Sequence, residues 1–289
     1  MEIPDRICIV LPAKNEQAGL CGLIPELKNN VPDAEIIVVD SGSTDKTAEI
    51  ASQHGATVVT QPYSFGNGAA IKAGIRAARG NILVLMDADG QHPPENLPEI
   101  LEKLHQGYDM VVGARQPSSH ASLGRRFANA FYNRFASWIT NSQIDDLTSG
   151  FRAVNLDKAR EFLHLLPNGF SYPTTLTMAF LRSGLSVGFV PIRARSRRGE
   201  SHIRPIRDGI RFLLIIFKVG TLYSPLKVFL PMAVFHFCVG VGYYAWTYSN
   251  FNRLTNMSVI LFLVAGLIFL IGLLSEQITS LYYSLRERR

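Results

Sequence analysis

Hydrophobic and polar residues follow two different patterns along the chain, and the change between them comes near residue 225. In the first part, short apolar runs alternate with segments of helical spacing. The strand-like runs are residues 7–11, 36–39, 58–59 and 82–86, and the helical segments between them are 16–30, 44–54 and 69–79. Continuously apolar strands separated by helices are typical of a parallel sheet covered on both faces, so the pattern predicts an α/β fold.

A less regular stretch follows the fourth predicted strand. Residues 108–113 and 185–192 are expected to form two further strands. Between them, residues 123–140 predict a helix because aromatic side chains recur every three or four positions. Residues 146–152 have the composition of a turn.

The second part of the chain contains two long segments without a charged residue. Residues 228–248 form a segment of 21 residues, and residues 254–275 form one of 22. Each is long enough for a helix to cross a hydrocarbon core of roughly 30 Å. A pair of buried core helices is the alternative, but a globular helix of this length normally keeps a polar face. We therefore expect two transmembrane helices.

Basic residues around these segments predict their orientation. Two lysines precede the first segment and three arginines follow the second, whereas the connection at 249–256 contains only Arg253. Because cytoplasmic loops carry the excess of Lys and Arg, we expect both termini and the soluble part on the cytoplasmic side of an inner or plasma membrane. The N-terminus has no basic region followed by an apolar stretch, so no cleavable signal is expected.

The net charge of +6 is concentrated just before the first apolar segment. Residues 193–211 contain seven arginines against two acidic residues. Their position beside two membrane spans favours lipid headgroups or a phosphate substrate, so we expect a membrane partner and no nucleic acid. Residues 206–222 mix arginines with apolar residues and predict an amphipathic helix at the membrane interface.

Asp87 and Asp89 follow the fourth predicted strand, with Ala88 between them and Gln91 two residues on. Ligands of such sheets bind beyond the carboxyl ends of the strands. Two carboxylates and an amide oxygen suit a hard cation, Mg²⁺ or Mn²⁺, which would neutralise a departing diphosphate. A solvated turn with a capping aspartate is the alternative, and the place of the motif in the fold favours the metal site.

Other polar residues gather at the same edge of the predicted sheet. The second strand ends at Asp40, whose carboxylate can accept hydrogen bonds from base or ribose donors. For residues 41–47, helix capping and ligand contact stay equally open. Residues 66–70 open a helix, and their glycines suit either a diphosphate at the helix N-terminus or close backbone packing.

As an ordered set, these motifs resemble those of the family 2 glycosyltransferases, and within them the polyprenyl-phosphate glycosyltransferases typified by dolichyl-phosphate mannose synthase. The matching segments are LPAKNE at 11–16, VVDSGSTDKT at 38–47, GNGAAIKAG at 66–74, DADGQH at 87–92, VVGAR at 111–115, DLTSGFRA at 146–153 and RRGESH at 197–202. The resemblance covers about residues 5–215. It implies a GT-A fold, the Rossmann-like fold of nucleotide-diphospho-sugar transferases, and an inverting mechanism.

The resemblance also implies roles for individual residues. Those expected around the nucleoside are Pro12, Lys14, Glu16 and Asp40. Those expected at the metal and diphosphate are Asp87, Ala88, Asp89 and Gln91, and those expected to close on the phosphates are Arg197, Arg198 and His202. The chain departs from the family pattern at Lys14, Ser41 and His202, which leaves the choice between a UDP- and a GDP-sugar open.

The resemblance implies a lipid phosphate as the acceptor, and elementary chemistry indicates what such an acceptor needs. A lipid phosphate has a second pKa of about 6, so at neutral pH it is largely a dianion and needs no general base. It needs cations to position it. Arg115 is one candidate, and Arg125 and Arg126 at the start of the next predicted helix are others, although a solvated helix face explains the latter two equally well.

Asp146 lies in the predicted turn that ends at Arg152. We expect Asp146 either to orient Arg152, a further substrate contact, or to act at the acceptor site. Together with Asp89 and Arg115, Asp146 completes the set of residues predicted to be catalytic.

The sequence thus predicts a cytoplasmic GT-A domain at residues 1–205, an amphipathic helix at 206–224 and a two-helix membrane anchor at 225–289. The expected activity is transfer of a hexose from a UDP- or GDP-sugar to a polyprenyl phosphate, and the resemblance also allows a homo-oligomer. Two alternatives are a membrane scaffold without catalysis and a processive polysaccharide synthase. The second is disfavoured because neither tryptophan follows an arginine, as the Gln-x-x-Arg-Trp motif of those synthases requires.

Overall fold

The computed structural model describes residues 5–116, 123–169, 171–195, 214, 217–218, 220–222 and 224–287; the side chains of residues 123–128 and 282–287 are outside the described part. The chain divides into two units. The first comprises Met1–Ser137 with Ser142–Arg204, and the second comprises Trp138–Asn141 with Pro205–Arg289.

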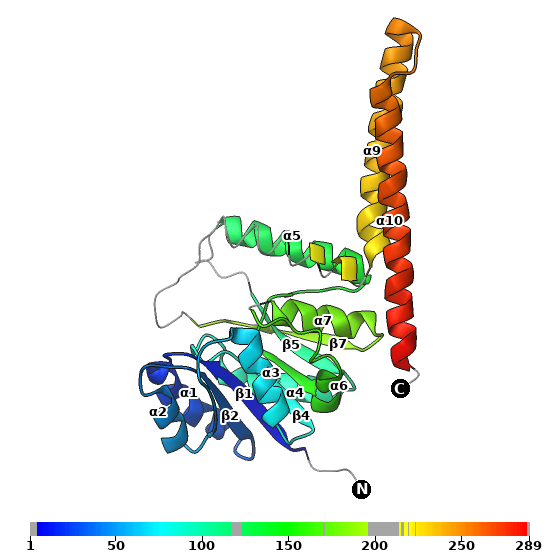
Figure 1. Ribbon diagram of the computed structural model, residues 1–289. Helices are drawn as coiled ribbons and strands as arrows, with labels where there is room; N and C mark the ends of the chain where they lie inside the picture. Colours follow the sequence, from blue (N-terminus) through cyan, green and yellow to red (C-terminus); the bar gives the residue numbers. More distant parts are fainter. Residues whose placement is uncertain are drawn as a thin grey trace. The chain divides into compact units, whose positions relative to one another are not determined.

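One seven-stranded sheet forms the centre of the first unit, in the order β3-β2-β1-β4-β6-β5-β7 (Figure 1). The strands are β1 Ile7–Ala13, β2 Glu35–Ser41, β3 Thr57–Gln61, β4 Ile82–Leu85, β5 Met110–Arg115, β6 Arg152–Asn155 and β7 Val187–Ile192. All strands except β6 were expected from their apolar runs and are confirmed. The side chains of β1, β2, β4 and β5 are mostly buried because helices cover the sheet, whereas β3, at the edge of the sheet, is half-exposed.

The sheet is mixed, which corrects the expectation of a parallel sheet. Strand β6 lies between β4 and β5 and runs antiparallel to both. Its four residues, Arg-Ala-Val-Asn, contain only two apolar side chains between polar ends, so the apolar pattern gives too short a signal to predict a strand. The predicted turn therefore ends where β6 begins.

The helices of the first unit are α1 Gln17–Asn30, α2 Thr47–Gln53, α3 Asn67–Ala77, α4 Leu97–His105, α6 Leu156–Glu161 and α7 Tyr172–Arg182, with a 3₁₀ turn η1 at Pro94–Asn96. Helix α5, Leu123–Thr140, begins in the first unit and ends in the second. Helices α1, α2, α3 and α5 are confirmed, whereas α4, α6 and α7 were not expected. Helix α4 buries leucine and isoleucine side chains at 97, 100, 101 and 104, which is an amphipathic spacing.

Helices cover the sheet on both sides. Side chains of α1 and α4 share one core cluster with Ile9 and Leu11 of β1. The intervening Val10 faces the other side, where Gly74 of α3 packs against it. This layered arrangement leaves the carboxyl ends of β1, β2 and β4 at one edge of the sheet.

Gly66 and Gly68, at the start of α3, pack closely against the backbone of a neighbouring segment. A β-carbon on Gly68 would lie 2.1 Å from the carbonyl oxygen of Pro167, and one on Gly66 would lie 2.4 Å from that of Asn168. The N–H groups of Gly68 and Ala69 donate to the carbonyls of Gly169 (3.2 Å) and Asn168 (3.1 Å). The helix N-terminus is thus bonded to protein, so of the two alternatives for these glycines the structure supports backbone packing.

Gly68→Ala is therefore expected to lower the free energy of unfolding by about 1–3 kcal/mol, because the added methyl group meets backbone atoms that cannot rotate away. Gly22→Ala in α1 is the matched control, since nothing lies within 4 Å of its added methyl group. That variant is expected to be as stable as the wild type or up to about 1 kcal/mol more stable. Thermal and urea unfolding of both variants check this prediction, and equal stabilities would contradict it.

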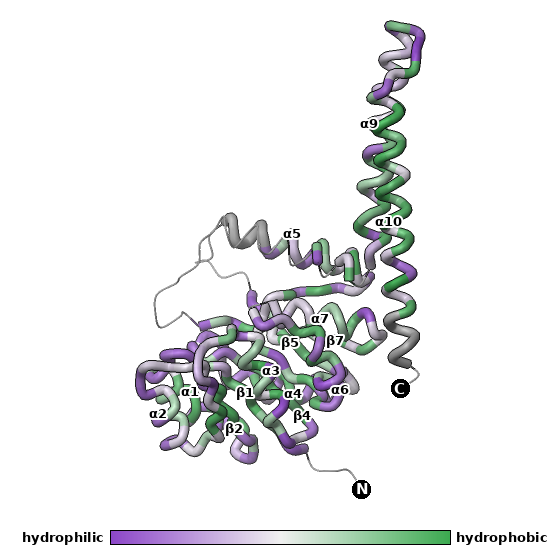
Figure 2. Tube along the Cα trace, in the orientation of Figure 1, coloured by the Kyte–Doolittle hydropathy of each residue, from purple (hydrophilic) through white to green (hydrophobic). Residues whose placement is uncertain are grey.

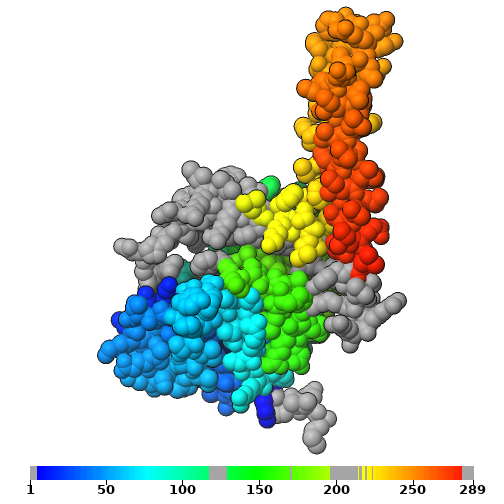
Figure 3. Space-filling view, in the orientation of Figure 1, coloured from blue at the N-terminus to red at the C-terminus, as the bar shows by residue number. Residues whose placement is uncertain are grey.

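The second unit contains two long apolar helices, α9 Pro225–Phe251 and α10 Asn256–Glu287. Apolar residues run along both (Figure 2), and the helices pack side by side (Figure 3). Both are long and apolar enough to cross a membrane, as expected from the uncharged segments. The predicted amphipathic helix at 206–222 lies almost entirely outside the described residues.

Contacts within this hairpin fix one helix against the other. Gly272 of α10 lies against Phe229 of α9, where a β-carbon would come within 2.6 Å of the phenylalanine Cβ. Glu276 of α10 accepts a hydrogen bond from the N–H of Leu226 in the first turn of α9 (3.1 Å). The carboxylate thereby satisfies a free N–H group at the positive end of the helix.

Candidate active site

The carboxyl ends of β1 and β2 meet in register, with Ala13 opposite Asp40. The two loops that follow are bonded to each other. The N–H of Asn15 donates to Ser43 Oγ (2.9 Å), the N–H of Thr44 donates to Asn15 Oδ1 (2.9 Å), and the N–H of Glu16 donates to Thr47 Oγ1 (2.9 Å). The hydroxyl groups at 43 and 47 are therefore engaged in joining the loops.

The residues predicted around the nucleoside lie along this joined edge. Lys14 is exposed, Pro12 and Glu16 are half-buried, and Asp40 is buried. Asp40 Oδ1 accepts a hydrogen bond from the N–H of Ser43 at 3.2 Å, which fixes its carboxylate at the end of β2. The structure brings all four together on neighbouring strands and loops, and their role at the nucleoside stays a prediction.

Asp87 and Asp89 follow β4 at the same edge. Gly19 of α1 packs directly against this turn, since a β-carbon there would lie 2.6 Å from the carbonyl oxygen of Ala88. Asp89 Oδ1 accepts a hydrogen bond from the N–H of Gln91 (3.1 Å). The Gln91 carbonyl in turn accepts one from the N–H of Arg195 (2.9 Å). The turn is thus fixed from both sides.

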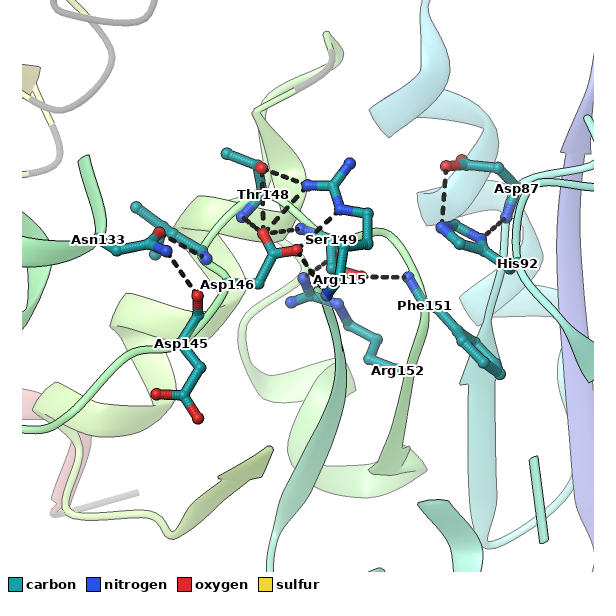
Figure 4. A network of polar contacts seen from close by, with 11 residues as sticks. Asp87, His92, Arg115, Asn133, Asp145, Asp146, Thr148, Ser149, Phe151 and Arg152 are labelled. Atoms are coloured by element: carbon teal, nitrogen blue, oxygen red, sulfur yellow. Dashed lines mark hydrogen bonds and ion pairs between the residues drawn. The ribbon is translucent and has the colours of Figure 1, made fainter. Parts of the chain in front are cut away.

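His92 is a site residue whose role the sequence analysis missed, although it stands inside the DADGQH motif. Its ring is buried, and its Nδ1 accepts a hydrogen bond from the N–H of Asp87 at 3.2 Å (Figure 4). Burial lowers the pKa of His92 despite the nearby Asp87 and Asp89 carboxylates, so the ring is neutral at neutral pH. With Nδ1 accepting, the proton of the neutral ring lies on Nε2.

The acidic turn suits a divalent cation that is shared with a substrate. No group of three His, Cys, Asp or Glu side chains suited to a metal ion occurs within the described residues. Two carboxylates and the Gln91 amide are instead an incomplete oxygen set, of the kind that Mg²⁺ and related ions complete with substrate phosphates and water. The residues present therefore fit a metal–diphosphate site and not a closed structural metal site.

Arg115, at the end of β5, is held by Asp146 and Thr148 (Figure 4). Its Nε donates to Asp146 Oδ2 (2.8 Å), and its Nη2 donates to Asp146 Oδ1 (3.0 Å) and Thr148 Oγ1 (2.6 Å). Burial opposes both charges, but the ion pair prevails: it raises the pKa of Arg115 and lowers the pKa of Asp146. Both groups are therefore charged at neutral pH.

Asp146 orients Arg115 and not Arg152, which resolves one alternative left open by the sequence. Arg152 is 0% exposed. Its guanidinium donates to Pro173 O (3.0 Å), Thr177 Oγ1 (3.1 Å) and Ser149 O. Burial lowers the pKa of Arg152 to about 10, so it stays a cation at neutral pH. It was expected as a substrate contact, and the structure instead encloses it in protein behind the site.

The remaining predicted residues cannot be placed. Arg197, Arg198 and His202 lie outside the described residues. Arg125 and Arg126 lie in the first turns of α5, but their side chains are outside the described part. Their predicted roles stay predictions.

Comparison with known proteins shows the family to which the chain belongs. The sequence model described as "Glycosyl transferase family 2" matches residues 8–162. The chain belongs to this family. A second model, "GtrB C-terminal hairpin", matches residues 224–281 and thus covers α9 and most of α10.

Relatives support the same family along the whole chain. "Glycosyltransferase AglJ" of Haloferax volcanii is 28% identical over 304 aligned residues, covering 100% of this chain and 98% of the relative. "Dolichyl-phosphate hexose transferase" of the same organism is 31% identical over 223 residues, covering 74% of this chain and 94% of the relative.

A solved structure agrees with the fold. Glucosyl-3-phosphoglycerate synthase from Mycobacterium tuberculosis, in complex with Mn²⁺, UDP and glucosyl-3-phosphoglycerate, has a TM-score of 0.59 and 25% identity, covering 75% of this chain and 80% of the synthase. The predicted GT-A fold and enzyme class are confirmed. This family 2 chain is a glycosyltransferase, so the scaffold without catalysis is set aside.

Proposed function

We propose that this glycosyltransferase transfers a hexose from a UDP- or GDP-sugar to a polyprenyl phosphate, with inversion at the anomeric carbon. The observation that carries the proposal is that the acidic turn and the charged guanidinium of Arg115 lie at the same edge of the sheet. The guanidinium is oriented by Asp146 and can bind an anion. Asp87 lies close enough to contribute to the raised pKa of Arg115. Such a site can hold a donor diphosphate and an acceptor phosphate together.

Relatives support the acceptor. One is named for dolichyl phosphate, and another, "Undecaprenyl-phosphate 4-deoxy-4-formamido-L-arabinose transferase" of Pseudomonas aeruginosa, for undecaprenyl phosphate. The latter is 33% identical over 193 residues, covering 59% of this chain and 56% of the relative. Two long apolar helices in the same chain suit a substrate that resides in a membrane.

In the proposed mechanism, Pro12, Lys14, Glu16 and Asp40 bind the nucleoside. Asp87, Asp89 and Gln91 would hold Mg²⁺ or Mn²⁺, which when bound neutralises charge on the diphosphate. Arg115 positions the acceptor phosphate, whose dianionic oxygen attacks the anomeric carbon as the bond to the diphosphate breaks.

Asp146 acts as a positioning residue in this mechanism. Its two oxygens accept hydrogen bonds from Arg115, Thr148 and Ser149. A carboxylate so fully engaged, with a lowered pKa, is a poor proton acceptor. The dianionic phosphate makes a general base unnecessary, in agreement with the arrangement of the site.

The domain boundaries at 1–205, 206–224 and 225–289, the cytoplasmic position of both termini and a homo-oligomer belong to this proposal. The proposal also includes Arg197, Arg198 and His202, which would close on the donor phosphates. Arg125 and Arg126 would help to position the acceptor phosphate. These five basic residues would complete the cationic surroundings of the two substrates.

Incubation of the full-length protein with a panel of labelled UDP- and GDP-sugars tests the proposed reaction. We expect one donor to give a labelled product that is extracted with organic solvent when polyprenyl phosphate is present. The matched control is the corresponding polyprenol, which has the same chain without the phosphate and should accept no sugar. Label on the polyprenol, or several sugars on each lipid, would contradict the proposed acceptor and favour a different transferase or a processive synthase.

A further inference from the structure

Two buried polar atoms next to the acidic turn have no hydrogen-bond partner among the described residues. They are the hydroxyl group of Tyr172 and Nε of Arg152. Both side chains are almost completely enclosed. A buried donor left without a partner costs about 1–3 kcal/mol, so native structures rarely retain one. Tyr172 interacts electrostatically with both Arg152 and Asp87, so the two unpartnered atoms belong to the surroundings of the acidic turn.

Tyr172 borders the same space as Asp87. A β-carbon on Gly150 would lie 2.9 Å from Asp87 Oδ2 and 3.2 Å from the Tyr172 hydroxyl oxygen. Both oxygens therefore lie around the one small volume that the missing side chain of Gly150 leaves open. Burial, together with the charge of Asp87, raises the pKa of Tyr172, so the phenol keeps a proton to donate.

His92 approaches the same carboxylate oxygen. Because Nδ1 accepts from the N–H of Asp87, the ring presents Nε2–H, which lies 3.9 Å from Asp87 Oδ2 (Figure 4). This distance exceeds a hydrogen bond, so a direct bond requires the carboxylate to turn toward the ring. The ring stacks on Phe151 with centroids 5.4 Å apart, which fixes its orientation.

We propose that Tyr172 and His92 are positioning residues that hold Asp87 for the divalent cation. Their O–H and Nε2–H groups are the two donors for Asp87 Oδ2, and Nε of Arg152 donates to the phenol oxygen behind them. This chain of contacts satisfies both unpartnered atoms and leaves the other oxygen of Asp87 for the cation. It rests on the proposed function only in requiring that Asp87 binds the metal. Groups that orient a metal ligand in this way typically affect metal affinity about 10- to 100-fold.

Binding of Mn²⁺ tests the inference without any sugar transfer. Free Mn²⁺ is measured by electron paramagnetic resonance with the full-length protein, alone and with UDP or GDP. Tyr172→Phe, which removes one oxygen atom, is expected to weaken Mn²⁺ binding about tenfold with little change in thermal stability. Tyr108→Phe is the matched control, because Tyr108 precedes the opposite end of β5, and it should bind Mn²⁺ like the wild type.

Two substitutions of His92 distinguish the roles of its two ring nitrogen atoms. His92→Gln places an amide N–H near the position of Nε2, whereas His92→Asn places an acceptor near Nδ1 and provides no donor to Oδ2. We expect the glutamine variant to bind Mn²⁺ several-fold more tightly than the asparagine variant. Unchanged Mn²⁺ affinity in both Tyr172→Phe and His92→Asn, or no Mn²⁺ binding by the wild type under any of these conditions, would overturn the inference. If the wild type binds Mn²⁺ but transfers no sugar to a lipid phosphate, the proposed function fails, and the Mn²⁺ affinities of Tyr172→Phe and His92→Asn still decide this inference.

Discussion

Asp89→Ala is expected to reduce sugar transfer by about a hundredfold or more, the loss typical when a single group that stabilises developing charge is removed. Asp89 is one of two carboxylates in the turn after β4, and its backbone surroundings are fixed by Gly19 and Gln91. Without it, a cation loses a charged ligand at the position where the departing diphosphate gains negative charge. Initial rates at saturating donor and acceptor measure the effect.

Asp157→Ala is the matched control for Asp89, because the side chain of Asp157 is 85% exposed and its ion pair with Arg160 lies on the surface of α6. It should transfer sugar at the wild-type rate. Transfer that survives both Asp89→Ala and removal of divalent cations by a chelator would contradict the assignment of the acidic turn.

Arg115→Ala is expected to lower kcat/KM for the lipid phosphate by about 30-fold, since a hydrogen bond to a charged group contributes about 2 kcal/mol. The dissociation constant of the donor should change little, because Arg115 belongs to β5 and not to β1 and β2, which carry the residues proposed to bind the nucleoside. Arg115→Lys should recover part of the loss, because it restores the charge without the planar fork. Acceptor kinetics and donor binding, measured separately, check this split.

The control for Arg115 is Arg76→Ala, at an exposed position in the last turn of α3. Thermal unfolding of Arg115→Ala should accompany the kinetics, because Asp146 loses a partner but keeps the N–H groups of Thr148 and Ser149. Equal losses in donor binding and in acceptor use would argue against an acceptor role for Arg115.

Local sequence pattern predicted the parts of the fold that depend on neighbouring residues. The apolar runs of β1, β2 and β4 and the acidic turn after β4 can be read directly, because a strand buried on both faces needs a continuous apolar run. The same reasoning placed Pro12, Asp40 and Asp87 at one edge, since the carboxyl ends of parallel strands meet there.

Pairings between distant residues could not be predicted in the same way. Arg115 and Asp146 are 31 positions apart, and Asp146 pairs with it and not with the nearer Arg152 because β6 turns Arg152 into the protein interior. Two acceptors of Arg152, Pro173 O and Thr177 Oγ1, come from α7, a helix that the pattern did not reveal. His92 was overlooked because its role depends on a hydrogen bond to a backbone N–H.

The placement of β6 has a consequence for synthesis on the ribosome. Strand β5 bonds to β6 and β7 but not to β4, so β4 has an open edge until residues 152–155 have left the exit tunnel. A nascent chain that stops earlier contains the acidic turn and Arg115 but has no strand to join the two halves of the sheet. Because an open strand edge is a template for incorrect pairing, the nascent chain is most vulnerable to aggregation between the emergence of β4 and the emergence of β6 from the tunnel.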